Sequence, residues 1–541
     1  MCDSARAADP WPAPALSEPP AATSPETPPT APPDPAAPTA DESATPPPAI
    51  ARARQMWLEG HYDDALAAFE TLQASAASDA ERIEAGIGAA GCQVQTGEYR
   101  PALERLNALP PAREGFAEWH CAVAEVQNLL GAYDRAIEHA RAAIDLDRRS
   151  ARPRRLLGQI LEYLGRRDDA IEAYAWFNRQ MVERPDLPSD AEWLTDAAYG
   201  FYRYSALTRT DIKRRTRYVL VELLQNAYER VDRTYWPARV AAADLLRAKY
   251  NDDEEDGSVS DYAAALRINE NLPQAYVGLG AIALDRWDFE DVERKAATAL
   301  GINPAFAPAH HLLAHCRIQE RRYDEAVAEA EKALLTNPND LEALSLQAAA
   351  RACVYDQAAV DALVRRIEAV NPRCATLYRL LGDATGGIRQ YETSEAHYQK
   401  AIEFDPTDAN ARTELGMMYM QWGLEDRARS ALDGSWALDP YNERTYNTLE
   451  LLDSLQAFQR YESEHFEVRY DDTQDPGLGA YVAAYLERIY PLVTGDYDVE
   501  LEHKTVIEVF PTHKQFGVRI TGKPWIHTVG ACTGRVIALD S

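Results

Sequence analysis

Long apolar runs and basic residues are scarce in this sequence of 541 residues. No run reaches the roughly 18 apolar residues that a membrane-spanning helix needs, so no transmembrane segment is predicted. Lys and Arg total 56 and Asp and Glu total 86, which gives a net charge of -30. A surface of this charge repels phosphate backbones, so we do not expect nucleic acid as a partner.

The 7 cysteines lack the paired spacing of a disulfide framework or a zinc site. They are Cys2, Cys92, Cys121, Cys316, Cys353, Cys374 and Cys532. We interpret most of them as small core residues on helices, so they do not decide the redox compartment.

The N-terminal stretch, residues 1–48, consists mainly of Pro, Ala, Ser, Thr and Asp. Such a composition offers too little apolar surface to offset chain entropy, so we predict a disordered tether. Cys2 has the place of a lipid-modified cysteine, and Ala5-Arg6-Ala7 has the small-x-small form of a cleavage site, but the apolar segment of a secretory signal is missing. Two localisations stay open: an extracytoplasmic or lipid-anchored protein held at Cys2, and a cytoplasmic one.

A dipeptide ending in proline recurs every 34 residues in the second half of the chain. Its copies are Asn303-Pro304, Asn337-Pro338, Asn371-Pro372, Asp405-Pro406 and Asp439-Pro440. Proline lacks the amide donor and clashes with the preceding helical turn, so each copy marks the end of a helix. A period of 34 residues is the repeat length of the tetratricopeptide helical hairpin, and the chain resembles that family.

Small and large residues alternate within these units as the hairpin requires. Leu415, Gly416 and Tyr419 form one face of a first helix, and Ala428 and Leu432 pack against it from a second. Gly or Ala at a crossing point lets two helices approach closely. The first half repeats the turn with Gly60, Gly97, Gly131 and Gly165, and the pattern fades between Met181 and Tyr250.

These patterns predict a mainly α fold, a tetratricopeptide α-solenoid followed by a truncated α/β domain. We assign the tether to residues 1–48, N-terminal repeats to 49–180 and degenerate helical repeats to 181–270. C-terminal repeats take 271–460, with a final helix from Asn442 to Arg460, and the α/β segment takes 461–541.

The concave surface of such an array, lined by the first helix of each hairpin, usually binds the ligand. One groove-facing position followed through the repeats gives His311, Ser345, Arg379, Thr413 and Asn447, and the position one turn later includes His315 and Asp383. This mixed lining suits an extended peptide or protein segment better than a small metabolite. We predict these seven residues as a peptide-binding groove.

His311 and His315 lie four residues apart, a spacing that can place two imidazoles on one metal. No Glu follows His311, as the zinc motif His-Glu-x-x-His requires, and a third ligand is not evident. We therefore interpret both as polar groove positions and predict neither a metal site nor a cofactor in this chain.

The pattern changes from about Tyr461 onwards. His465–Tyr470, Thr505–Phe510 and Arg535–Leu539 alternate like strands, while Leu478–Tyr490 is helical. Gly517-x4-Gly522-Lys523 has part of a phosphate-binding loop pattern, but Pro524 stands where Ser or Thr is required. We therefore predict an α/β segment without a phosphate-binding loop.

The runs 511–519 and 530–541 resemble the opening of the peptidase MA-like domain found behind tetratricopeptide arrays in some bacterial proteins. The resemblance implies a zinc-binding His-Glu-x-x-His helix after this region, with the Glu activating a metal-bound water. The sequence contains no such motif, so no catalytic residue or zinc ligand is assigned. Two functions stay open: a binding scaffold with an inactive appendage, or a zinc peptidase whose motif lies beyond Ser541. An open strand edge favours the second.

Overall fold

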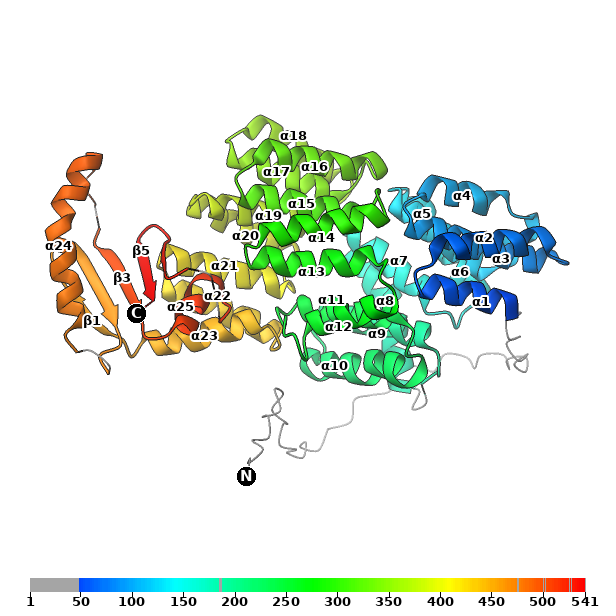
Figure 1. The fold of residues 1–541 in the computed structure, drawn as a ribbon, viewed down its shortest axis with the longest axis horizontal. Helices are drawn as coiled ribbons and strands as arrows, with labels where there is room; N and C mark the ends of the chain where they lie inside the picture. The colour runs from blue at the N-terminus through cyan, green and yellow to red at the C-terminus, as the bar shows by residue number, and fades with distance from the viewer. Residues whose placement is uncertain are drawn as a thin grey trace, which may run out of the picture. The chain divides into compact units, whose positions relative to one another are not determined.

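The structure is a computed structural model that describes residues 48–183, 187–473, 476–499, 501, 503–524, 526 and 528–540. The predicted tether lies outside the described residues except for Pro48, where the first helix begins. From there the described chain is mainly helical and ends in a small sheet (Figure 1), so the mainly α prediction is confirmed.

Most helices form hairpins in which consecutive helices pack side by side. The N-terminal hairpins are α1 (Pro48–Leu58) with α2 (Tyr62–Ser75), α3 (Asp79–Gln95) with α4 (Tyr99–Ala108), α5 (Ala117–Leu129) with α6 (Tyr133–Leu146), and α7 (Arg152–Tyr163) with α8 (Arg167–Glu183). A short 3-10 helix, η1 (Pro111–Gly115), precedes α5.

The second half repeats this arrangement. Its hairpins are α11 (Trp236–Arg247) with α12 (Ser258–Ile268), α13 (Pro273–Asp285) with α14 (Phe289–Ile302), α15 (Ala307–Gln319) with α16 (Tyr323–Thr336), α17 (Leu341–Cys353) with α18 (Gln357–Glu368), α19 (Ala375–Gly387) with α20 (Tyr391–Phe404), and α21 (Ala409–Trp422) with α22 (Glu425–Leu438). The last helix of the array is α23 (Glu443–Leu455).

The stretch between the two halves departs from regular hairpins. It contains α9 (Ala191–Thr208), α10 (Ile212–Tyr218) and two π-helical segments, η2 (Val219–Gln225) and η3 (Ala227–Val231). π-helical geometry is rare and widens the helix, which changes the spacing of side chains along it. The fading of the repeat signature in the sequence coincides with this stretch.

Close approach of paired helices explains the glycines at their crossings. A Cβ added to Gly382 would lie 2.9 Å from the ring of Tyr398, and one added to Gly416 would lie 2.6 Å from Leu432. The larger partner fills the space that the glycine leaves open. The small and large positions therefore pack against each other as the sequence indicated.

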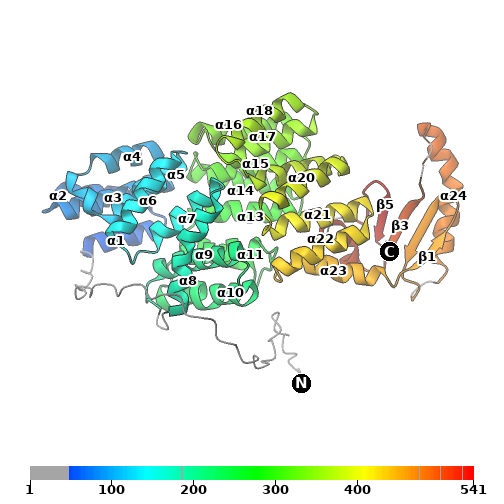
Figure 2. The ribbon, with the colours of Figure 1, turned by 180° about the vertical axis from the view of Figure 1, so that it is seen from behind.

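The N-terminal hairpins lie beside the C-terminal ones, as Figures 1 and 2 show for α5 and α16. The contacts recur in step with the repeat. Asn269, Asn303 and Asn337 donate from their side-chain amides to the hydroxyls of Tyr62, Tyr99 and Tyr133, over 2.9, 3.1 and 2.9 Å. Asn371 continues the row by donating to the carbonyl of Tyr163.

The next contacts in this row are ionic. Arg167 binds the carboxylate of Asp405 over 2.7 Å, and Lys249 binds that of Asp439 over 2.6 Å. The residue before each proline therefore ends a helix and also joins two distant parts of the array. We call this row of contacts the inter-turn ladder: Asn269, Asn303, Asn337, Asn371, Asp405 and Asp439 with their partners.

A five-stranded sheet with the order β1-β2-β3-β5-β4 follows the array. Its strands are β1 (Gln459–Glu462), β2 (Phe466–Tyr470), β3 (Thr505–Phe510), β4 (Gly530–Cys532) and β5 (Val536–Asp540). β2, β3 and β5 are parallel, whereas β1 and β4 pair antiparallel at the two edges. α24 (Leu478–Tyr497) runs along the outer face of the sheet, and α25 (His513–Thr521) lies on the side of the repeats (Figure 1).

The final helix predicted for residues 442–460 is too long, because α23 ends at Leu455 and Gln459 already pairs with Tyr470 in the sheet. Pairing with β2 extends the backbone where a short polar strand alone gives no clear signal. In the described part of the chain, no helix combines the length and the apolarity that crossing a membrane requires.

Candidate functional site

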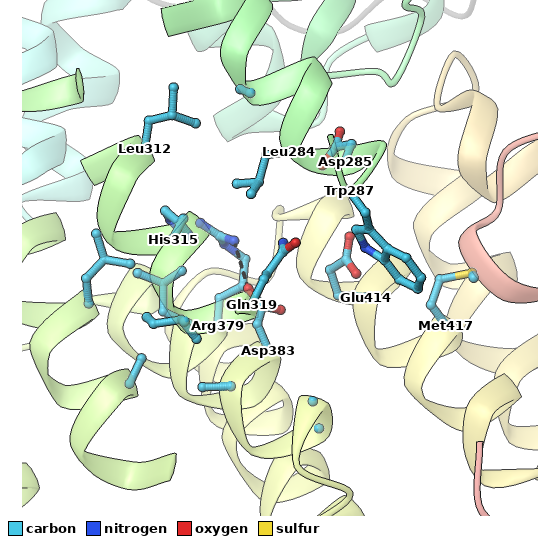
Figure 3. A pocket seen from close by; sticks show the side chains of 18 of the residues that line it. Leu284, Asp285, Trp287, Leu312, His315, Gln319, Arg379, Asp383, Glu414 and Met417 are labelled. Carbon is cyan, nitrogen blue, oxygen red and sulfur yellow. Dashed lines mark hydrogen bonds and ion pairs between the residues drawn. The ribbon is translucent and has the colours of Figure 1, made fainter. Parts of the chain in front are cut away.

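A cavity of about 910 Å³ lies among the first helices of the C-terminal hairpins. Residues from α13, α15, α17, α19 and α21 line it, and α23 and the end of α25 close it at one end. Figure 3 shows the side chains that meet there. The volume falls in the range of sites that bind small ligands or a few residues of a peptide.

Apolar side chains supply part of the wall, among them Leu284, Leu312 and Met417. Trp287 is the largest, and its indole lies on the side of Glu414 and Met417, across from Arg379 and His315 (Figure 3). Trp287 is 54% exposed, and its backbone has a φ of +60°. A large residue rarely adopts this left-handed conformation, so the fold places an exposed indole at the cavity under local strain.

A cluster of two histidines and two carboxylates forms one wall. The Nε2 of His311 lies 3.0 Å from Asp340, and its Nδ1 lies 3.5 Å from Glu342. Burial lowers the pKa of His311, but these carboxylates outweigh it and raise the pKa above the usual range. Burial likewise disfavours the Glu342 carboxylate, yet His311 and His315 lower its pKa to about 2.

Ion pairs neutralise most of the other charges in the wall. Arg379 lies 3.3 Å from Asp383, which also accepts a hydrogen bond from Tyr398. Glu414 accepts hydrogen bonds from Tyr250 and Arg444. The cavity therefore presents self-paired polar groups beside apolar side chains, and its lining carries no large charge of one sign.

The end of α25 closes the cavity through Lys523. Its ammonium pairs with Asp252 and lies 3.4 Å from Asp285. Arg444 donates from Nε to the carbonyl of Thr521 over 2.6 Å and holds the same segment. The lysine of the phosphate-loop-like string therefore forms a structural tie between the C-terminal segment and the repeats.

The seven predicted groove residues divide by environment. His311, His315, Arg379 and Asp383 line the cavity. Ser345 and Thr413 are fully buried, and their hydroxyls bond to Leu341 and to neighbouring hydroxyls. Asn447 donates to the carbonyl of Gly522. They occupy two repeat positions one helical turn apart, and the short side chains of Ser345 and Thr413 stay between packed helices.

Sequence reasoning missed Trp287, Arg444 and Lys523 as lining residues. A signal existed for Trp287, because it stands where the first half of the chain has a turn glycine. Lys523 carried none, since it reaches the cavity only through the docking of the segment that follows α25, whereas Arg444 lies on α23 of the array. Among the described residues, no group of three His, Cys, Asp or Glu side chains could hold a metal ion.

Family models for the tetratricopeptide repeat match residues 56–126, 260–350 and 397–430. These stretches include Asn269, Asn303, Asn337 and Asp405 of the inter-turn ladder and part of the cavity wall. The matched stretches are tetratricopeptide repeats.

Among curated proteins, the chain is similar to the human mitochondrial import receptor subunit TOM70, with 25% identity over 162 residues. The match covers 28% of this chain and 26% of the relative, so the chain spans about a quarter of that protein's length. A thermophilic TPR protein of Thermus thermophilus matches with 18% identity and a TM-score of 0.27, over 34% of this chain and 100% of its own. YrrB, a TPR protein with an unusual peptide-binding site, matches with 16% identity and a TM-score of 0.21, over 33% and 92%.

Proposed function

We propose that this chain is a protein-binding scaffold that holds an extended polypeptide segment in the cavity of its C-terminal repeats. Trp287 carries the proposal, because an exposed indole in a strained backbone position contributes nothing evident to folding. Trp residues of this kind dominate the binding energy of many protein interfaces. The receptor named as a relative is consistent with a binding role.

The polar lining supports a peptide rather than a charged metabolite. Arg379, Glu342 and Glu414 already have partners within the wall, so these three groups do not await a strongly charged ligand. The apolar side chains of the wall suit the side chains of an extended polypeptide, and the polar groups beside them suit hydrogen bonds to its backbone.

Two matched variants test this function. Peptides of 12 residues are first selected from a random phage library against the full chain. Their affinities for the unaltered chain and for the Trp287→Gly and Tyr355→Gly variants are then measured by fluorescence polarisation. Both substitutions remove an exposed aromatic from a left-handed turn, but only Trp287 lines the cavity. We expect Trp287→Gly to weaken binding about tenfold and Tyr355→Gly to leave it unchanged. Equal effects, or no selectable peptide, would contradict the proposal.

A second candidate function rests on the C-terminal sheet. The strands and helices between Gln459 and Asp540 include the runs whose sequence resembles the opening of a peptidase MA-like domain, and this resemblance is the basis of the candidate. On this candidate the array delivers a polypeptide to a zinc peptidase whose His-Glu-x-x-His helix follows Ser541. Sequencing the transcript downstream of the Ser541 codon tests it: a His-Glu-x-x-His codon run supports the peptidase, and an immediate stop codon rejects it. Residues 1–541 themselves are expected to cleave no peptide with added zinc.

A further inference from the structure

One backbone position recurs in the turn between the two helices of each hairpin, where φ is positive. Gly60, Gly97, Gly131 and Gly165 hold it in the N-terminal hairpins, and an asparagine of the inter-turn ladder lies against each. In four later hairpins the position carries large side chains: Trp287, Arg321, Tyr355 and Arg389, with φ of 60, 63, 61 and 65°. Gly423 holds it again in the last hairpin, with a φ of 78°.

Arg389 shows what such a turn binds. Its guanidinium donates to the carbonyl of Cys532 over 2.8 Å. Tyr391, two residues on, donates its hydroxyl to the carbonyl of Thr533 over 2.6 Å. The pair thus holds two consecutive backbone carbonyls where the chain leaves β4 towards β5.

Arg321 and Tyr323 repeat this pair two repeat periods earlier, in the same turn of another hairpin. Arg321 is exposed, and its guanidinium makes no hydrogen bond or ion pair with any residue that the structure describes. The hydroxyl of Tyr323 lies by the thiol of Cys353, which is a weak partner compared with a carbonyl. Both side chains line the cavity, whereas Arg389 and Tyr391 are already bonded to the carbonyls of Cys532 and Thr533.

We propose that Arg321 and Tyr323 bind two consecutive backbone carbonyls of a partner protein at a point where its chain leaves a strand for a turn, as the chain does at Cys532 and Thr533. The inference rests on the proposed function, since the same segment would continue into the cavity. Both donors bind backbone carbonyls, so this pair recognises the end of a strand whatever the partner's side chains are. Trp287 supplies the side-chain anchor. A second copy of this chain is a poorer occupant, because its β4–β5 hairpin is already held by its own Arg389 and Tyr391.

The test uses full-length chain and the 12-residue peptides selected above. Arg321→Gly and Tyr323→Phe each remove one donor, and Arg322→Ala is the matched control, an adjacent exposed arginine paired with Glu325. We expect a loss of affinity of about fivefold to tenfold for each of the first two and less than about twofold for the control. Arg321→Gly should also raise the melting temperature, because glycine relieves the left-handed backbone, so weaker binding cannot be attributed to unfolding.

Three outcomes are distinguishable. We expect some selected peptides to depend on Trp287 for binding. If these peptides bind the Arg321→Gly and Tyr323→Phe variants as tightly as they bind the unaltered chain, this inference is overturned and the proposed function stands. An absence of any Trp287-dependent peptide would reject the function itself. Light scattering that shows a dimer of the unaltered chain and a monomer of Arg321→Gly would overturn the inference by identifying a second copy as the occupant.

Discussion

The side-chain amide of Asn303 donates a hydrogen bond to the hydroxyl of Tyr99, 204 residues earlier in the chain. Asn337 and Tyr133 repeat the contact at the same separation. The contacts recur once per repeat, so a shift of one contact would also displace the contacts on either side of it. The inter-turn ladder therefore fixes how the N-terminal hairpins lie on the C-terminal ones. The proposed binding cavity depends on this closure, because Lys249 pairs with Asp439 in the ladder and the adjacent Tyr250 lines the cavity.

Asn303→Ala should destabilise the protein by about 1–3 kcal/mol, because it leaves the buried Tyr99 hydroxyl without its donor. It also removes the bond from the Ala305 amide to the asparagine side chain. The midpoint of urea unfolding measures the loss. Asn107→Ala, at an exposed position on α4, is the control and should leave the midpoint unchanged. Equal midpoints for both variants would refute the ladder as a source of stability.

Gly97→Ala should destabilise the protein by at least about 1–2 kcal/mol, since φ is +87° and only glycine adopts this region freely. The added Cβ would also lie 2.4 Å from the Oδ1 of Asn303. Gly91→Ala is the matched control in α3, where nothing lies within 4 Å of the new methyl, and it should stabilise by about 0.5–1 kcal/mol. Thermal melts of the two variants should therefore move in opposite directions.

Asp439→Asn should be far more damaging than Asp405→Asn, although both replace an aspartate of the ladder. Lys249 is 1% exposed, so losing its counter-charge leaves a buried cation and costs about 3–5 kcal/mol. Arg167 and Asp405 are partly exposed, and their pair contributes about 0–1 kcal/mol. Urea unfolding of both variants compares them, and a larger loss for Asp405→Asn would contradict this burial argument.

His311 should make stability depend on pH. Its pKa is raised in the folded protein, with Asp340 and Glu342 outweighing burial, so the protonated form stabilises the fold. That contribution is complete below the unfolded pKa of about 6.5 and is lost as the pH rises through the folded value. The melting temperature of the unaltered chain should therefore exceed that of His311→Asn by more at pH 5.5 than at pH 8.5. A difference that does not change with pH would show that His311 stays neutral.

Much of the array could be predicted from the sequence, because Pro304 and its periodic equivalents act locally. The ladder role of Asn303 could not, since its partner Tyr99 lies in another hairpin and no local pattern joins them. The candidate site likewise combines features that the local sequence predicts with features that depend on packing. His311 and Arg379 line the cavity, but repeat position could not distinguish them from Ser345, whose short side chain stays between packed helices.

The C-terminal segment shows a second limit. β2, β3 and β5 alternate in apolar residues clearly enough to predict strands. β1 (Gln459–Glu462) is polar and exposed, and it becomes a strand only by pairing with β2. Lys523 likewise gains its role from Asp252, far away in the sequence. Contacts of this kind depend on tertiary packing, which a single sequence does not display.

The central claim is that the cavity of the C-terminal repeats binds an extended polypeptide. Hydrogen exchange measured by mass spectrometry, with and without a selected 12-residue peptide, tests it most directly. We predict slower exchange in α13, α15, α17 and α19 and in the turn at Arg321, with no change in α1 to α6. Protection confined to the N-terminal hairpins, or to α24 and the sheet, would contradict the account.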